Sequence, residues 1–186
     1  MTDRRHVLVA GFALLASGVR RPSWAAGSAG RFADDFWKRP RRIMLQQAKS
    51  GERIESTYWS DGELLMPEYT QLSYFMRDRV TGTGVYVHPV LLDILYGING
   101  WLAYYGVRSP VILTSAYRDP RRNLAIEGSV RNSLHTHGDA ADIVIPGVNA
   151  LQVARFGMWL GGGGVGWYPG KQFTHVDRGR LRSWRG

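Results

Sequence analysis

Residues 133–142 read Ser-Leu-His-Thr-His-Gly-Asp-Ala-Ala-Asp and place a histidine, His135, seven positions before an aspartate, Asp142. In a straight β-strand these two residues would lie roughly 23 Å apart, and along a helix axis about 10 Å apart. Neither arrangement lets both side chains bind one ion. A shared ion requires the chain to fold back between them, and Gly138 permits a sharp turn there. The stretch therefore predicts either a metal site built around a turn or a chance grouping of polar residues.

The run Phe173-Thr174-His175-Val176-Asp177 is typical of a short strand. In a strand His175 and Asp177 point to the same face, where each needs a partner. A metal ion satisfies this need, and so does an ordinary hydrogen bond, so the spacing alone leaves both open. Because the chain has no cysteine, any metal site must use nitrogen and oxygen ligands, a combination that suits zinc.

Helix and strand patterns are mixed along the chain without strict alternation. Apolar residues at 90, 91, 94, 95, 98 and 102 recur at helical spacing and predict a helix over 89–105, ended by Gly106. Further helices are expected at 67–79, 120–127 and 151–160. Strands are expected at 43–48, 53–59, 111–114, 140–145, 165–168 and 173–177. This order indicates one α+β domain with a small antiparallel sheet flanked by helices.

The first 26 residues have the features of a signal peptide. Arg4 and Arg5 precede an apolar run at 7–16, and the small residues Ser23, Ala25 and Ala26 follow. The run is too short to cross a bilayer, which takes about 20 apolar residues. The paired arginines resemble a twin-arginine signal. We therefore expect export to the periplasm, with no stable membrane insertion after the signal is cleaved.

The length of 186 residues fits one domain, which we place at 41–186 after a lead-in segment at 27–40. The formal net charge is +9, and without the first 25 residues 20 Lys and Arg remain against 14 Asp and Glu. A basic surface favours an anionic polymer, either nucleic acid or acidic cell wall, or has no partner at all. A nucleic-acid partner is not expected, because the chain lacks clustered basic helices and its signal predicts export.

Residues 133–142 also match the S-x-H-x-x-G-x-A-x-D signature of zinc peptidases that act on bacterial cell-wall peptides. This superfamily includes D-Ala-D-Ala carboxypeptidases, phage endolysins and murein endopeptidases. The chain most resembles the twin-arginine-exported murein endopeptidases, a branch formerly described as a domain of unknown function. The other shared motifs, in the same order, are Tyr58-Trp59-Ser60-Asp61-Gly62, Arg77-Asp78, Leu91-Leu92-Asp93, Ser115-Ala116-Tyr117-Arg118-Asp119-Pro120 with Asn123, Gly164-Val165-Gly166-Trp167-Tyr168-Pro169, and Phe173-Thr174-His175-Val176-Asp177 with Arg182 and Trp184.

The resemblance implies a hedgehog/DD-peptidase-like fold and a zinc peptidase domain at 41–186. It implies that His135, Asp142 and His175 bind Zn²⁺ and leave a fourth position for water. Arg118 would hold the substrate or stabilise the developing oxyanion. The structural alternative for Arg118 is an ion pair with Asp119 or another acidic residue.

One position departs from the wider superfamily. Its dipeptidases carry a glutamate general base three residues before the last histidine ligand, where this chain has Gln172. An amide cannot accept a proton from water, so Asp177 or His137 would have to serve as the catalytic base. Asp177 has the alternative role of orienting a ligand histidine, and His137 that of a ligand in a His135/His137 pair.

The resemblance implies a zinc-dependent murein endopeptidase that hydrolyses peptide cross-links of peptidoglycan, with the peptide stems as its binding partner. The amide at Gln172 keeps an alternative open. This alternative is a non-catalytic, zinc-containing module that binds peptidoglycan.

Overall fold

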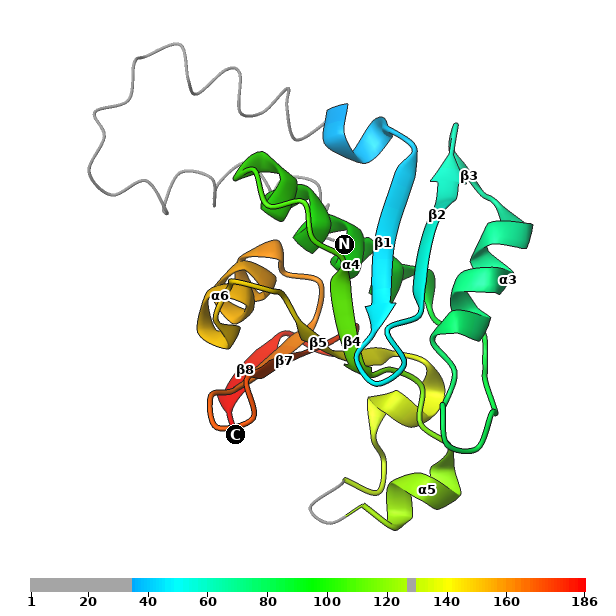
Figure 1. Cartoon of the computed structure of the whole chain (residues 1–186), viewed down its shortest axis with the longest axis vertical. Helices are drawn as coiled ribbons and strands as arrows, with labels where there is room; N and C mark the ends of the chain where they lie inside the picture. The colour runs from blue at the N-terminus through cyan, green and yellow to red at the C-terminus, as the bar shows by residue number, and fades with distance from the viewer. Residues whose placement is uncertain (1–34, 127–129) are drawn as a thin grey trace.

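A mixed sheet of eight strands forms the centre of the computed structural model, which describes residues 35–126 and 130–186 (Figure 1). The strand order is β3-β2-β1-β4-β5-β7-β6-β8. The strands are β1 (Arg41–Gln47), β2 (Arg53–Ser60), β3 (Glu63–Leu64), β4 (Val111–Ser115), β5 (Ala140–Val144), β6 (Gly164–Tyr168), β7 (Phe173–Asp177) and β8 (Arg182–Arg185). The helices are α3 (Met66–Phe75), α4 (Pro89–Tyr104), α5 (Pro120–Leu124), α6 (Ala150–Leu160) and the 3₁₀ turn η1 (Leu134–His137).

The α+β class is confirmed, but the sheet is larger than expected and is not purely antiparallel. Strand β1 pairs with β4 in parallel, and so does β6 with β8. Strands β3 and β8 were not predicted, since β3 has only two residues and β8 carries two arginines. The helix predicted at 67–79 ends at Phe75, and Asp78 beyond it accepts a hydrogen bond from the backbone N–H of Val80 in the loop that follows. The helix predicted at 120–127 is observed as α5 but ends at Leu124, and residue 127 lies outside the described residues.

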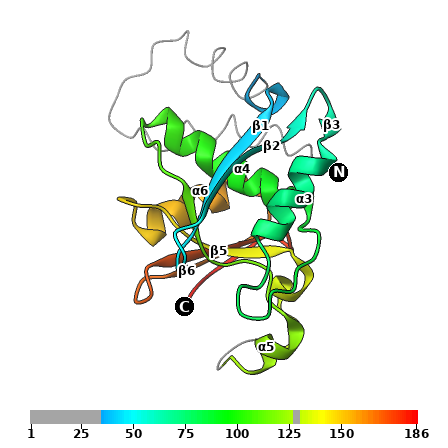
Figure 2. The ribbon, with the colours of Figure 1, turned by 45° about the vertical axis from the view of Figure 1, so that its right-hand side comes forward.

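The hydrophobic core lies between the sheet and the helices: α4 and α6 contact β1, β6 and β7, and α3 contacts β2 and adds Leu72 and Phe75. Helix α4 buries apolar side chains that recur at the predicted helical spacing. From the strands, Ala141, Ile143 and Val176 belong to the same core. Because side chains alternate along a strand, Asp142 and His175 point to the opposite face. In Figures 1 and 2 that side also holds α5, with β5 running between α5 and the core helices.

The segment just before β1 packs against α4. The ring of Phe36 stacks on Tyr96 with 4.5 Å between centroids, and it covers Gly100 so closely that a Cβ there would overlap it. The signal peptide predicted at 1–26 lies outside the described residues, as does the part of the lead-in up to residue 34. The division at residues 26 and 40 therefore stays a prediction. Within the described residues, no helix has the length and apolar character needed to cross a membrane.

Candidate metal centre

Three side chains from two strands and a turn converge on the face of the sheet away from α4 and α6. Asp142 on β5 and His175 on β7 are direct partners in the antiparallel ladder, so their side chains are neighbours on one face. His135 comes from η1, which ends at Gly138 with a φ of 72°. The backbone N–H of Asp139 donates to Leu134 at 3.0 Å and closes this turn. The fold-back predicted at Gly138 is confirmed, and it brings His135 beside Asp142.

The positive φ of Gly138 yields a first prediction. An alanine there would adopt a left-handed conformation and place its Cβ 2.8 Å from Cγ2 of Val85. Gly138→Ala is expected to lower the free energy of unfolding by about 2–4 kcal/mol, in urea titrations of the metal-free protein. The control is Gly147→Ala, because Gly147 has a φ of 77° but no atom near the new Cβ. Its loss should be only about 1–2 kcal/mol. Equal losses would show that the contact with Val85 does not matter.

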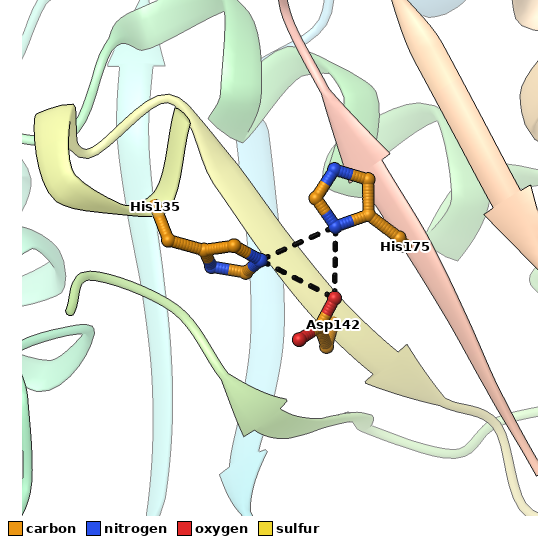
Figure 3. Close-up of side chains that lie close together, drawn as sticks. All are labelled: His135, Asp142 and His175. Carbon is orange, nitrogen blue, oxygen red and sulfur yellow. Dashed lines mark hydrogen bonds and ion pairs between the residues drawn. The ribbon is translucent and has the colours of Figure 1, made fainter. Parts of the chain in front are cut away.

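The facing atoms of the three side chains have the spacing of a zinc site (Figure 3). Nε2 of His135 lies 3.2 Å from Nδ1 of His175 and 3.3 Å from Oδ1 of Asp142. Nδ1 of His175 lies 2.9 Å from the same Oδ1. A tetrahedral zinc ion with bonds of about 2.0–2.1 Å separates neighbouring ligand atoms by about 3.3 Å. The residues therefore fit a zinc ion, and they form the one such cluster among residues 35–126 and 130–186.

Each imidazole is held in place by a hydrogen bond from its other nitrogen. Nδ1–H of His135 donates to the backbone carbonyl of Ala116 at 2.6 Å, which leaves the lone pair of Nε2 available for a metal ion. Nε2–H of His175 donates to Oδ2 of Asp177 at 3.0 Å, which leaves Nδ1 as the ligand atom. Hydrogen bonds of this kind fix the tautomer and the ring orientation of metal-binding histidines.

Asp142 carries the negative charge of the cluster. Burial acts to raise the pKa of this carboxyl group, but the charges and hydrogen bonds of His135 and His175 outweigh it and hold the pKa well below its usual value. Asp142 therefore stays a carboxylate, the form that binds a metal.

Asp177 is completely buried and its carboxylate is saturated with donors. Oδ1 accepts from the backbone N–H groups of Gly164 at 3.0 Å and Gly179 at 2.7 Å, and from Arg182 at 3.1 Å. Oδ2 accepts from Arg182 at 2.7 Å and from His175. A general base needs an oxygen that faces the attacking water. This geometry favours the role of orienting His175 over that of accepting a proton.

Arg118 lies beside the cluster, and other side chains hold its guanidinium. Nη1 donates to Oδ1 of Asn123 at 3.0 Å, Nη2 donates to Oγ of Ser115 at 3.2 Å, and Nη2 lies 3.7 Å from Oδ2 of Asp142. Burial lowers the pKa of Arg118, although the Asp142 carboxylate partly offsets this effect. Of the expected alternative partners, Asp119 instead caps α5 by accepting from the N–H of Arg121, and the acidic residue that pairs with Arg118 is Asp142.

Two other residues considered in the sequence, the candidate base His137 and the amide Gln172 at the usual base position, are not part of the cluster. Gln172 occupies the turn between β6 and β7 with a φ of 55°, and its amide donates to the carbonyl of Pro169. His137 is exposed, and its Nδ1 lies 3.2 Å from the carbonyl of Ser133. The alternative His135/His137 ligand pair is therefore not formed.

Sequence reasoning assigned no role to several residues that support the site. Ser115 and Asn123 fix Arg118, and Arg182 fixes Asp177. All three belong to the motifs shared with the murein endopeptidases, so the sequence comparison pointed to these positions but not to their roles. Their contacts became visible only in the folded chain.

Two imidazoles and one carboxylate on an α+β sheet, with a fixed arginine beside them, define a metallopeptidase-type site. A family model described as Peptidoglycan L,D-endopeptidase MepK matches residues 36–184. The chain is 32% identical over 187 residues to Peptidoglycan L,D-endopeptidase MepK of Escherichia coli (strain K12), covering 98% of this chain and 97% of that relative. It is 31% identical to Probable peptidoglycan L,D-endopeptidase MepK of Haemophilus influenzae over 150 residues, covering 80% and 81% of the two chains. The chain therefore belongs to the peptidoglycan L,D-endopeptidase MepK family.

Proposed function

We propose that this protein is a zinc-dependent murein endopeptidase that hydrolyses peptide cross-links of peptidoglycan, with His135, Asp142 and His175 as its zinc ligands. The observation that carries the proposal is the convergence of two imidazole nitrogens and one carboxylate oxygen at 2.9–3.3 Å from one another. Because the relatives are named L,D-endopeptidases, we propose that the cleaved bond is an L,D cross-link.

The chain's own residues divide the work as follows. A zinc ion bound here supplies Lewis-acid chemistry, which activates water and polarises the scissile carbonyl. Arg118 binds the substrate or the developing oxyanion, because its fork is fixed next to Asp142. Asp177 orients His175 through the hydrogen bond to Nε2. We propose that the enzyme works in the periplasm after export by the twin-arginine route, which the sequence of residues 1–26 supports.

A second candidate function is a zinc-containing module that binds peptidoglycan without cutting it. The observation in its favour is Gln172, an amide whose side chain is bound to the carbonyl of Pro169 instead of facing the metal cluster. Gln172 cannot serve as the general base, and no other residue is assigned that role. A site without a general base is consistent with a module that no longer hydrolyses its ligand.

Mass spectrometry of muropeptide digests distinguishes the two functions. The purified protein is expected to convert L,D-cross-linked muropeptide dimers to monomers, and D,D-cross-linked dimers serve as the matched control substrate. A chelator should reduce cleavage to the background level, because the proposed reaction needs the Lewis acid that a zinc ion at this site would supply, and added zinc should restore it. Zinc-loaded protein that binds the dimers but leaves them intact would instead establish the binding module.

A further inference from the structure

Two glycines on β6 create space on the face of the sheet that carries the metal cluster. Gly164 is the ladder partner of Arg182, and Gly166 is the partner of both Trp184 and His175. A Cβ at Gly164 would overlap the Arg182 guanidinium and lie 2.7 Å from Oδ2 of Asp177. A Cβ at Gly166 would overlap the Trp184 indole. The two glycines therefore admit the side chains of β8 into positions that any larger residue would block.

Arg182 fills the first of these positions and holds Asp177 with both ends of its fork. Nη1 donates to Oδ1 at 3.1 Å and Nη2 donates to Oδ2 at 2.7 Å. Asp177 has no exposed side-chain surface, so its charge depends on these donors and on two backbone N–H groups. The oxygen that Arg182 holds at 2.7 Å is the one that accepts the hydrogen bond from His175. A planar, bidentate fork fixes the orientation of a carboxylate better than a point charge does.

Trp184 fills the second position and packs against His175 itself. The ring centroids of Trp184 and His175 lie 5.3 Å apart at an angle of 52°. The indole N–H donates to the hydroxyl of Tyr168 at 3.0 Å, and the Arg182 guanidinium lies 4.9 Å from the indole centroid. The indole is therefore held by a hydrogen bond at its N–H and by the guanidinium over its ring face. The indole thus packs beside the His175 ring, whose Nε2 is hydrogen-bonded to Asp177.

We propose that strand β8 is a positioning element for the metal centre: Arg182, through Asp177, and Trp184, by direct ring contact, hold Nδ1 of His175 toward the ion. This role rests on the proposed zinc site. Neither side chain touches the three facing ligand atoms, so both act through His175. Gly164 and Gly166 contribute to this positioning, because the absence of their side chains leaves the space that Arg182 and Trp184 occupy.

The test is the zinc dissociation constant of the purified full chain, measured by competition with a chromophoric chelator. Arg182→Gln is expected to weaken zinc binding by about 10-fold, the lower end of the range for outer-shell partners of metal ligands, because Arg182 acts on His175 only through Asp177. Arg182→Lys keeps the charge without the fork and should give an intermediate loss. The matched control is Arg185→Gln, which removes the same charge from an exposed position three residues along β8 and should change the constant less than about twofold.

Thermal unfolding of the metal-free variants separates positioning from general stabilisation. If β8 only stabilises the fold, Arg182→Gln lowers the melting temperature of the metal-free protein while its zinc dissociation constant stays equal to that of Arg185→Gln, and the proposal is overturned. If the metal-free Arg182→Gln protein is unfolded, the zinc dissociation constant of Arg182→Lys is the test instead. A dissociation constant equal to that of the wild type in Arg182→Lys also overturns the proposal. A wild-type chain that binds no zinc would instead refute the proposed function.

Discussion

Alanine at His135, Asp142 or His175 is expected to abolish stoichiometric zinc binding and to reduce cleavage of L,D-cross-linked muropeptides by at least about a thousandfold. Each side chain supplies one of the three converging atoms, and a site with two protein ligands loses most of its affinity. Loss of the metal removes several kcal/mol of transition-state stabilisation, at about 1.4 kcal/mol for each factor of ten in rate. Metal analysis of the purified variants and the dimer-to-monomer assay measure the two effects separately.

The control for this set is His137→Ala. His137 lies in the same 3₁₀ turn as His135, but it is exposed and its ring faces the carbonyl of Ser133. This variant should keep one zinc per chain and nearly full activity. Full zinc content in all three ligand variants would refute the assigned site, and loss of zinc in His137→Ala would reopen the His135/His137 pair.

Features that depend on local pattern could be predicted from the sequence. Helix α4 was expected because its apolar residues recur at helical spacing over about three turns, and it was observed at Pro89–Tyr104. The turn at Gly138 was expected because no regular structure could bring His135 and Asp142 to one ion. Strands β5 and β7 followed from short runs between turn residues.

Features that depend on distant residues could not be predicted. The sequence Arg-Ser-Trp-Arg of β8 has no strand pattern of its own. It forms a strand because β6 offers a free edge and two glycines at the right register. The choice between the two roles of Asp177 was open for the same reason, since it depends on Arg182 and on the N–H groups of Gly164 and Gly179. The parallel pairing of β1 with β4 is likewise set by a connection of more than 60 residues through α3 and α4.

Arg118→Ala is expected to lower kcat for cross-link hydrolysis by about 10²- to 10³-fold while the zinc content stays at the wild-type level. Loss of one preorganised donor to a developing oxyanion has effects of this size. Arg118 is held by Ser115 and Asn123 and contributes no atom to the ligand cluster, so its removal should spare the metal. Arg118→Lys should recover little activity, because an ammonium group cannot reproduce the planar fork.

Two further variants decide whether Arg118 acts on the substrate or only supports the fold. Asn123→Ala leaves Arg118 in place but frees one arm of its fork, so its loss of kcat should be smaller than that of Arg118→Ala. Arg121→Ala removes an exposed arginine three residues away and should leave kcat unchanged. If Arg118→Ala also loses its zinc, the nearest explanation is the 3.7 Å contact with Asp142, and Arg118 then acts by holding that ligand. Retained zinc with a low kcat in Arg118→Ala, together with a normal Arg121→Ala, places the guanidinium in the reaction itself.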